Sequence, residues 1–166
     1  MNLLEPSEEI VVAWLNQKGF FTLNNYKVGN KEIDVLAFKP RTGEKTHVEI
    51  GVSVNPVPPF GGIRKISKAP PLKERVKNYF EKKFQGTNDR TAKAVKEIFG
   101  TPGYQKMLVV GLLNPKYDTL EGLQQEFAKH HVKVVDFREV MKEIKITRTR
   151  YTDAREYIKL ARFFKD

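Results

Sequence analysis

Glu32-Ile33-Asp34-Val35-Leu36-Ala37-Phe38 is the stretch that decides the fold, and His47-Val48-Glu49-Ile50-Gly51 follows it after a turn. Both are apolar runs of strand length that carry an acidic residue. Side chains alternate along a strand, so Asp34 is expected to share a face with Leu36 while Ile33 and Val35 face the other way. An unpaired buried carboxylate is costly, and such groups normally pair with a cation, hydrogen bonds or a metal.

The chain around these runs predicts a helix followed by antiparallel strands. Ser7 is a suitable N-cap for a helix that ends at Gly19, with Glu8 on the same inward face as Val11, Val12 and Leu15. Strands are expected at residues 20–28 and 32–38, joined by the hairpin signal Gly29-Asn30, and at residues 47–54. Three adjacent antiparallel strands are the simplest arrangement.

The remainder of the chain predicts a second half with parallel strands. A loop rich in proline and glycine at residues 55–62 precedes a basic amphipathic helix at 72–84 and a helix at 89–99. A continuous apolar run at 107–113 indicates a strand covered on both faces. A helix through Leu120, Leu123 and Phe127 and a strand at 132–137 complete a strand-helix-strand unit, which implies parallel strands. Helices are expected at about 138–144 and 153–164.

These elements predict an α/β fold in which a mixed sheet is flanked by helices. The chain has 166 residues, which suits a single domain over 1–166, with a helical extension over about 138–166. The absence of cysteine excludes disulfides, thiolate zinc sites and a cysteine nucleophile. Residues 1–6 lack a basic, then apolar, secretory signal, and nothing in the sequence spans a bilayer. We therefore expect a cytoplasmic protein with no membrane contact.

The charge of the chain is strongly basic and favours a nucleic-acid partner. The sequence has 30 Lys and Arg against 20 Asp and Glu, a formal charge of +10. Basic side chains are concentrated between residues 63 and 84 and again between 142 and 165. Such patches commonly bind phosphate backbones, although a charged surface is also typical of heat-stable proteins. The predicted nucleic-acid contacts are Arg64, Lys65, Lys68, Lys73, Arg75 and Lys77.

Three acids are candidates for a metal site. Folding could bring Asp34 and Glu49 together on neighbouring strands, with Glu8 approaching from the first helix. An all-oxygen cluster suits Mg²⁺ or Mn²⁺, which activate water and stabilise charge on a phosphate. The alternative for Glu8 is an acid favoured by the helix macrodipole. The alternative for Asp34 and Glu49 is a structural ion pair with a nearby basic residue.

The order of these acids resembles the PD-(D/E)xK nuclease superfamily, especially archaeal Holliday-junction resolvases and other restriction-endonuclease-like proteins. The likeness covers about Ser7 to Val54, where Glu8 matches the helix acid, Glu32-Ile33-Asp34 the aspartate strand, and Val48-Glu49-Ile50-Gly51 the Val-Glu-Val-Lys segment. It implies a restriction-endonuclease-like fold, a metal-dependent DNA endonuclease, catalytic Glu8, Asp34 and Glu49, and a homodimer.

One position departs from that family. Gly51 stands where the family has its catalytic lysine, so a cation must come from elsewhere or catalysis is lost. Lys27 is the predicted substitute, and Arg64, Lys65, Lys73 or Arg75 could also reach the site. The competing functions are a catalytically degenerate DNA-binding module and an assembly subunit without a nucleic-acid ligand.

Overall fold

The structure is a computed structural model that describes residues 5–52, 70–113 and 118–144. Its centre is an open sheet of five strands in the order β1-β2-β3-β4-β5. The strands are β1 (Phe21–Val28), β2 (Lys31–Lys39), β3 (Glu44–Gly51), β4 (Gln105–Val110) and β5 (Val132–Asp136). The first three pair antiparallel and the last three pair parallel, so the predicted mixed sheet is confirmed.

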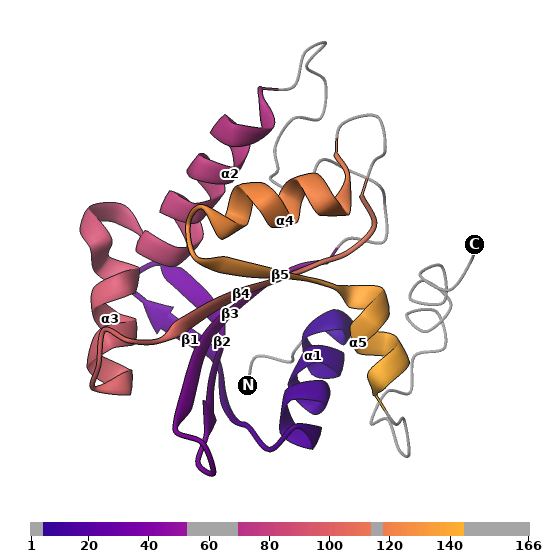
Figure 1. The fold of residues 1–166 in the computed structure, drawn as a ribbon. Helices are drawn as coiled ribbons and strands as arrows, with labels where there is room; N and C mark the ends of the chain where they lie inside the picture. The colour runs from indigo at the N-terminus through magenta and orange to yellow at the C-terminus, as the bar shows by residue number, and fades with distance from the viewer. Residues whose placement is uncertain (1–4, 53–69, 114–117, 145–166) are drawn as a thin grey trace.

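Helices cover both faces of this sheet (Figure 1). They are α1 (Pro6–Gln17), α2 (Leu72–Phe80), α3 (Arg90–Phe99), α4 (Leu120–Ala128) and α5 (Phe137–Glu143). A π-helical turn, η1 (Glu81–Gln85), continues α2, and a 3₁₀ turn, η2 (Thr87–Asp89), precedes α3. The fold is therefore a three-layer α/β arrangement, as the sequence predicted at this level.

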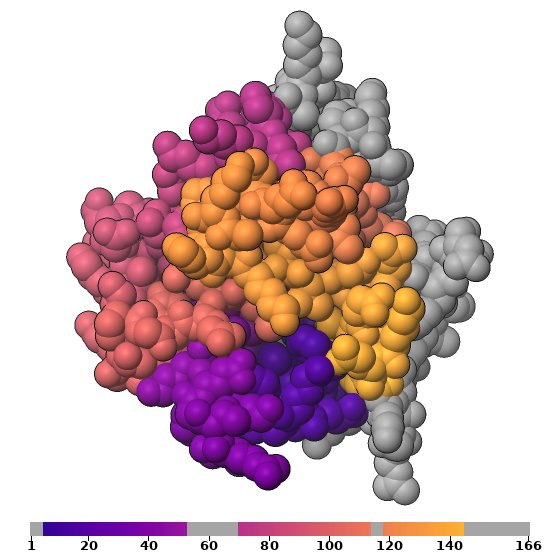
Figure 2. Space-filling view, viewed as in Figure 1, coloured from indigo at the N-terminus to yellow at the C-terminus, as the bar shows by residue number. Residues whose placement is uncertain are grey.

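Each layer has its own apolar core. Helices α1 and α5 lie side by side on one face (Figure 1, Figure 2) and pack with Val35, Val48 and Val109 of the sheet. On the opposite face, α2, η1 and α4 pack against Leu108 and Val110. Successive residues of β4 thus enter opposite cores, which explains why that segment is apolar without alternation.

Several element boundaries differ from the sequence prediction. Helix α1 begins at Pro6 with Glu5 as N-cap, so the assignment of Ser7 as N-cap was wrong. Proline has no backbone N–H to lose at the first helical position, and its fixed φ suits a helix start. The apolar strand ends at Val110, earlier than predicted, and the basic helix changes to a π-helical turn after Phe80. The expected loop 55–62, helix 153–164 and strand end at 52–54 lie wholly or partly outside the described residues.

The strict alternation expected along β2 is interrupted at Asp34. The ladder pairs Asn24 with Val35 and Tyr26 with Ile33, but no pair joins Asn25 to Asp34. Asn25 has a φ of 52°, outside the β region. Ile33 consequently packs with Leu36 and with Val95 of α3, in a different cluster from Val35. The predicted face of Ile33 was therefore wrong. Asp34 lies at this irregularity in β2.

None of the helices in the described ranges is long and apolar enough to cross a bilayer.

Candidate functional site

The two strand acids lie at the point where β2 and β3 separate. The last residue pair of this ladder joins Val35 to Val48, and Asp34 and Glu49 come next on the two strands. The Asp34 Oδ2 atom accepts a hydrogen bond of 2.7 Å from the backbone N–H of Ile50. This bond replaces a strand-to-strand bond and holds the carboxylate of Asp34 beside β3. The side chain of Glu49 is fully buried.

Lys83 is a basic residue that lies beside the two acids. Its Nζ atom lies 3.2 Å from the Glu49 Oε2 atom, and about a third of its side chain is exposed. Lys83 belongs to η1, whose geometry is marked by a hydrogen bond of 2.8 Å from the N–H of Gly86 to the carbonyl of Glu81. Single π-helical turns inside α-helices occur frequently at functional sites.

The helix that carries Lys83 also covers the position of Gly51. A Cβ placed on Gly51 would lie 3.7 Å from the Tyr79 hydroxyl and 3.7 Å from the Leu108 Cδ1 atom. The end of β3 therefore faces the junction of α2 and η1, and the cation approaches from this helical layer. A side-chain Cβ at position 51 would be in ordinary contact with this helical layer.

His47 contacts the other oxygen of Glu49. Its Nε2 atom lies 2.8 Å from Glu49 Oε1, and both side chains are fully buried. Burial is the main cause that lowers the pKa of His47 to about 3, so the imidazole is neutral at physiological pH. The ring of His47 also packs on the ring of Phe84, with centroids 4.8 Å apart.

The electrostatics of the site reflect two acids that share one nearby cation. Burial, and then the charge of Glu49, raise the pKa of Asp34 to about 7, against the opposing charge of Lys83. Burial likewise raises the pKa of Glu49, and Lys83 again opposes the shift. For Lys83, burial acts to lower the pKa, but the charges of Glu49 and Asp34 outweigh it. A second positive charge would therefore be accommodated here.

Two buried polar atoms of the site have no hydrogen-bond partner among the described residues. They are Glu49 Oε2 and His47 Nδ1. The Lys83 ammonium lies 3.2 Å from Oε2 and forms an ion pair with it. Unsatisfied buried polar atoms are uncommon in folded proteins, and catalytic groups are among the cases in which they occur. The partners of the Glu49 carboxylate are therefore the Lys83 ammonium and the neighbouring Asp34 carboxyl group.

Glu8 lies at the start of α1 and makes a helix-capping contact. Its Oε2 atom accepts a hydrogen bond of 3.1 Å from the backbone N–H of Glu5. Partial burial raises the pKa of Glu8, and the charge of Asp34 adds to the shift. Within residues 5–52, 70–113 and 118–144, no group of three or more acidic or histidine side chains is placed to hold a metal ion. The site built from all three acids therefore stays a prediction, while Asp34 and Glu49 are neighbours.

The predicted cations occupy other places. Lys27 is exposed on β1, and its partner across the ladder is Glu32. Lys73 and Lys77 are exposed on α2. Arg75 is buried and donates from both terminal nitrogens to Asp118, each bond 2.7 Å long. These bonds favour a structural role for Arg75, and Arg64, Lys65 and Lys68 lie outside the described residues.

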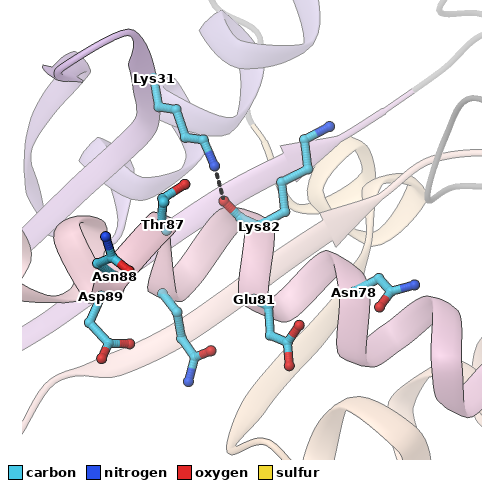
Figure 3. Close-up of a pocket in the computed structure, with 9 residues that line it drawn as sticks. Lys31, Asn78, Glu81, Lys82, Thr87, Asn88 and Asp89 are labelled. Carbon is cyan, nitrogen blue, oxygen red and sulfur yellow. Dashed lines mark hydrogen bonds between the residues drawn. The ribbon is translucent and has the colours of Figure 1, made fainter.

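A polar pocket of about 490 Å³ lies on the outer side of η1, next to the β1–β2 hairpin (Figure 3). Lys31 reaches across it from β2 and donates a bond of 3.5 Å to the backbone carbonyl of Lys82. Lys31 and Lys82 are offset in this pocket by Glu81 and Asp89. The balance of charge selects neither an anion nor a cation, so we assign the pocket no ligand.

Lys83 was missed because the basic side chains of residues 72–84 were assigned to the outer side of an amphipathic helix, where they would contact a phosphate backbone. Lys83 lies four residues after Tyr79 and seven after Val76, which are both on the inward face. A lysine at an inward position of an amphipathic helix was the signal that could have identified it.

Comparisons of the chain with protein-family models, with curated proteins and with solved structures found no match.

Proposed function

We propose that this protein is a metal-dependent DNA endonuclease of the PD-(D/E)xK type, in which Lys83 takes the role of the missing motif lysine. The observation that carries the proposal is the Lys83 ammonium, 3.2 Å from Glu49 and beside the strand end that holds Gly51. The resemblance of residues 7–54 to that superfamily supplies the reaction class, and the mixed sheet with flanking helices is compatible with its fold.

Asp34 and Glu49 would hold the metal. Their oxygens are the ligands that Mg²⁺ and Mn²⁺ prefer, and Glu49 Oε2 lacks a hydrogen-bond partner among the described residues. A divalent ion held there supplies a bound water of lowered pKa and neutralises charge on the phosphate. The ion would also favour the ionised form of Asp34, whose pKa burial and Glu49 raise to about 7.

Lys83 would act on the phosphodiester directly. An ammonium group fixed beside the carboxylates stabilises the negative charge that grows on the phosphate oxygens during attack by water. Its partly exposed side chain leaves the Nζ atom within reach of a substrate. The exposed Lys73, Lys77 and Lys82 on the same α2–η1 segment would then contact neighbouring phosphates.

The test is a cleavage assay on duplex, single-stranded and branched DNA, and on RNA, with Mg²⁺ or Mn²⁺. We expect DNA cleavage that stops in chelator and is lost in Asp34→Asn and Lys83→Met. The decisive variant is Gly51→Lys combined with Lys83→Met, which returns a lysine to the family position. Recovery of cleavage in this double variant supports the relocation of the lysine. Cleavage by Lys83→Met at the wild-type rate contradicts it.

A catalytically degenerate nucleic-acid-binding module is the second candidate. The observation that favours it is the Lys83–Glu49 ion pair itself, because a carboxylate neutralised by its own lysine has less need of a metal. This candidate predicts DNA binding that weakens with salt, persists in chelator and is unchanged in Asp34→Asn. Absence of any binding at low salt would leave the assembly subunit as the remaining function.

We further propose that the nuclease is a homodimer, because cutting both strands of a duplex requires two sites. The free edge of β1 is the favoured contact. Phe21 is 71% exposed, and Leu23, Phe38 and Ile98 are exposed with it around a groove of about 380 Å³. No residue from Phe21 to Tyr26 is charged, and among the described residues Lys45 is the one charged residue that lines the groove, so like charges are few at this contact. Sedimentation should show a dimer in the wild type and a monomer in Leu23→Lys.

A further inference from the structure

We propose that His47 is a positioning residue that fixes Glu49 and Lys83 relative to each other. The inference rests on the proposed function, because it concerns the geometry of that same site. His47 contacts Glu49 directly. It also packs on Phe84, the residue that follows Lys83 in the chain. A histidine buried for packing alone would make neither contact selectively.

The contact with Glu49 fixes the rotation of its carboxylate. We infer that the neutral imidazole donates from Nε2, the arrangement in which Glu49 is the acceptor beside the Lys83 ammonium. The bond from Nε2 to Oε1 is 2.8 Å long and turns the other oxygen, Oε2, toward Lys83. Groups that orient a metal-binding carboxylate in this way strengthen metal affinity and activity.

This arrangement leaves the other ring nitrogen unsatisfied. With the hydrogen on Nε2, Nδ1 is an acceptor, and it has no hydrogen-bond partner among the described residues. A buried acceptor without a donor destabilises the folded state. A leucine or phenylalanine would avoid that cost, so stability alone does not account for a histidine here.

The contact with Phe84 fixes the helical turn that carries Lys83. Phe84 is fully buried, and its ring packs on His47 at 4.8 Å with a tilt of 56°. The ring of Phe80 in turn stacks on the ring of Phe84, with centroids 5.8 Å apart. Lys83 precedes Phe84 within η1, so the backbone on one side of the lysine is held against the strand that carries Glu49.

Three substitutions separate these contacts. His47→Phe keeps an aromatic ring against Phe84 but removes the donor to Glu49. His47→Gln keeps an N–H donor of similar reach but removes the ring. Phe84→Leu removes the ring contact from the other side and keeps an apolar side chain, so the second contact can be tested even if His47→Gln does not fold.

The readouts are the metal dependence of cleavage and kcat at saturating metal. We expect His47→Phe to raise the half-saturating Mg²⁺ concentration by about 10–100-fold, the usual effect of losing an orienting partner. His47→Gln and Phe84→Leu should leave that concentration within about 3-fold and lower kcat by about 10-fold or more. Equal changes in all three variants, or changes in melting temperature alone, would overturn the proposal.

His130 is a matched control. Its ring packs on Phe80 with the same centroid separation, 4.8 Å, in the same aromatic cluster. It forms no ion pair with any acid in the described part of the chain. His130→Gln should therefore change neither the metal requirement nor kcat. An effect equal to that of His47→Gln would show that losing any ring of the aromatic cluster lowers kcat.

A second pair of measurements separates failure of this proposal from failure of the proposed function. In metal-free protein, NMR of the ring nitrogens should show His47 neutral and protonated on Nε2 between about pH 5 and pH 8. Chemical acylation followed by mass spectrometry should show Lys83 protected in the wild type and more reactive in His47→Gln. These results stand even if the protein cleaves nothing. Protonation on Nδ1, or unchanged Lys83 reactivity in His47→Gln, overturns the positioning role.

Discussion

Two ion pairs with a buried acid, Arg75–Asp118 and Lys83–Glu49, differ in how completely their atoms are bonded. Arg75 and Asp118 form two parallel bonds of 2.7 Å, and Arg75 donates a third, 2.9 Å long, to the carbonyl of Pro70. Lys83 and Glu49 form a single contact of 3.2 Å, with a second acid beside it and Glu49 Oε2 lacking a hydrogen bond in the described residues. We call the Arg75–Asp118 pair closed, because its bonds use both carboxylate oxygens, as in a structural ion pair. We call the Lys83–Glu49 pair open, because it keeps bonding capacity for a ligand.

Breaking the closed pair should have the largest effect on stability. Arg75→Ala leaves Asp118 buried and uncompensated, and we expect the free energy of unfolding to fall by about 3–5 kcal/mol. Urea denaturation measures the loss. The double variant Arg75→Met with Asp118→Leu should recover most of it, because no charge is then left buried. A loss below about 1 kcal/mol would contradict a structural role and return Arg75 to the predicted nucleic-acid contacts.

Breaking the open pair should act on catalysis more than on stability. We expect Lys83→Met to lower kcat by about 10²–10³-fold, the range seen when a group that stabilises transition-state charge is removed. Its effect on unfolding should be smaller than that of Arg75→Ala, because Glu49 and Asp34 can take up protons when the lysine is lost. Steady-state kinetics and urea denaturation on the same samples measure both effects. A larger loss of stability for Lys83→Met than for Arg75→Ala would remove the distinction between the two pairs.

The second acid of the open pair should make stability depend on pH. The pKa of Asp34 is about 7 in the folded chain against an ordinary value of 3.8, so the folded state binds more protons between these values. Stability in chelator should therefore fall as pH rises from about 4 to about 7. Asp34→Asn should flatten that dependence and be more stable than the wild type at pH 8, by at least about 1 kcal/mol. Thermal unfolding across this range tests it, with Glu139→Gln on the exposed face of α5 as control.

Much of the fold was predictable from the sequence because it depends on local patterns. The hairpin signal at Gly29-Asn30, the acids in apolar strands and the unalternating run of β4 each identify an element without long-range information. The juxtaposition of Asp34 and Glu49 also followed, since adjacent antiparallel strands bring successive acids together. The interrupted pairing at Asn25 did not follow, because its φ of 52° depends on the partner strand.

The position of Lys83 beside the two acids could not be predicted from local sequence patterns. Residues 52–71 connect β3 to the basic helix, and a connection of this length does not fix where along β3 that helix packs. The inward position of Lys83 beside Tyr79 was readable, but the acid that it meets was not. The helical register also changes at η1, and a π-helical turn has no sequence signature comparable to a capping residue.

Gly51→Ala should have the smallest effect, and it tests whether the glycine at the family's lysine position is a defect. The added Cβ would meet Leu108 Cδ1 and the Tyr79 hydroxyl at 3.7 Å, which is ordinary contact, and the φ of Gly51 is not in the left-handed region. We therefore expect the unfolding free energy to change by less than about 0.5 kcal/mol and cleavage to persist. If Gly51→Ala abolishes cleavage while the fold is retained, substrate backbone must approach this position closely. In that case the glycine serves the site, and the ammonium of Lys83 enters from the helical layer because the strand end has to stay free of a side chain.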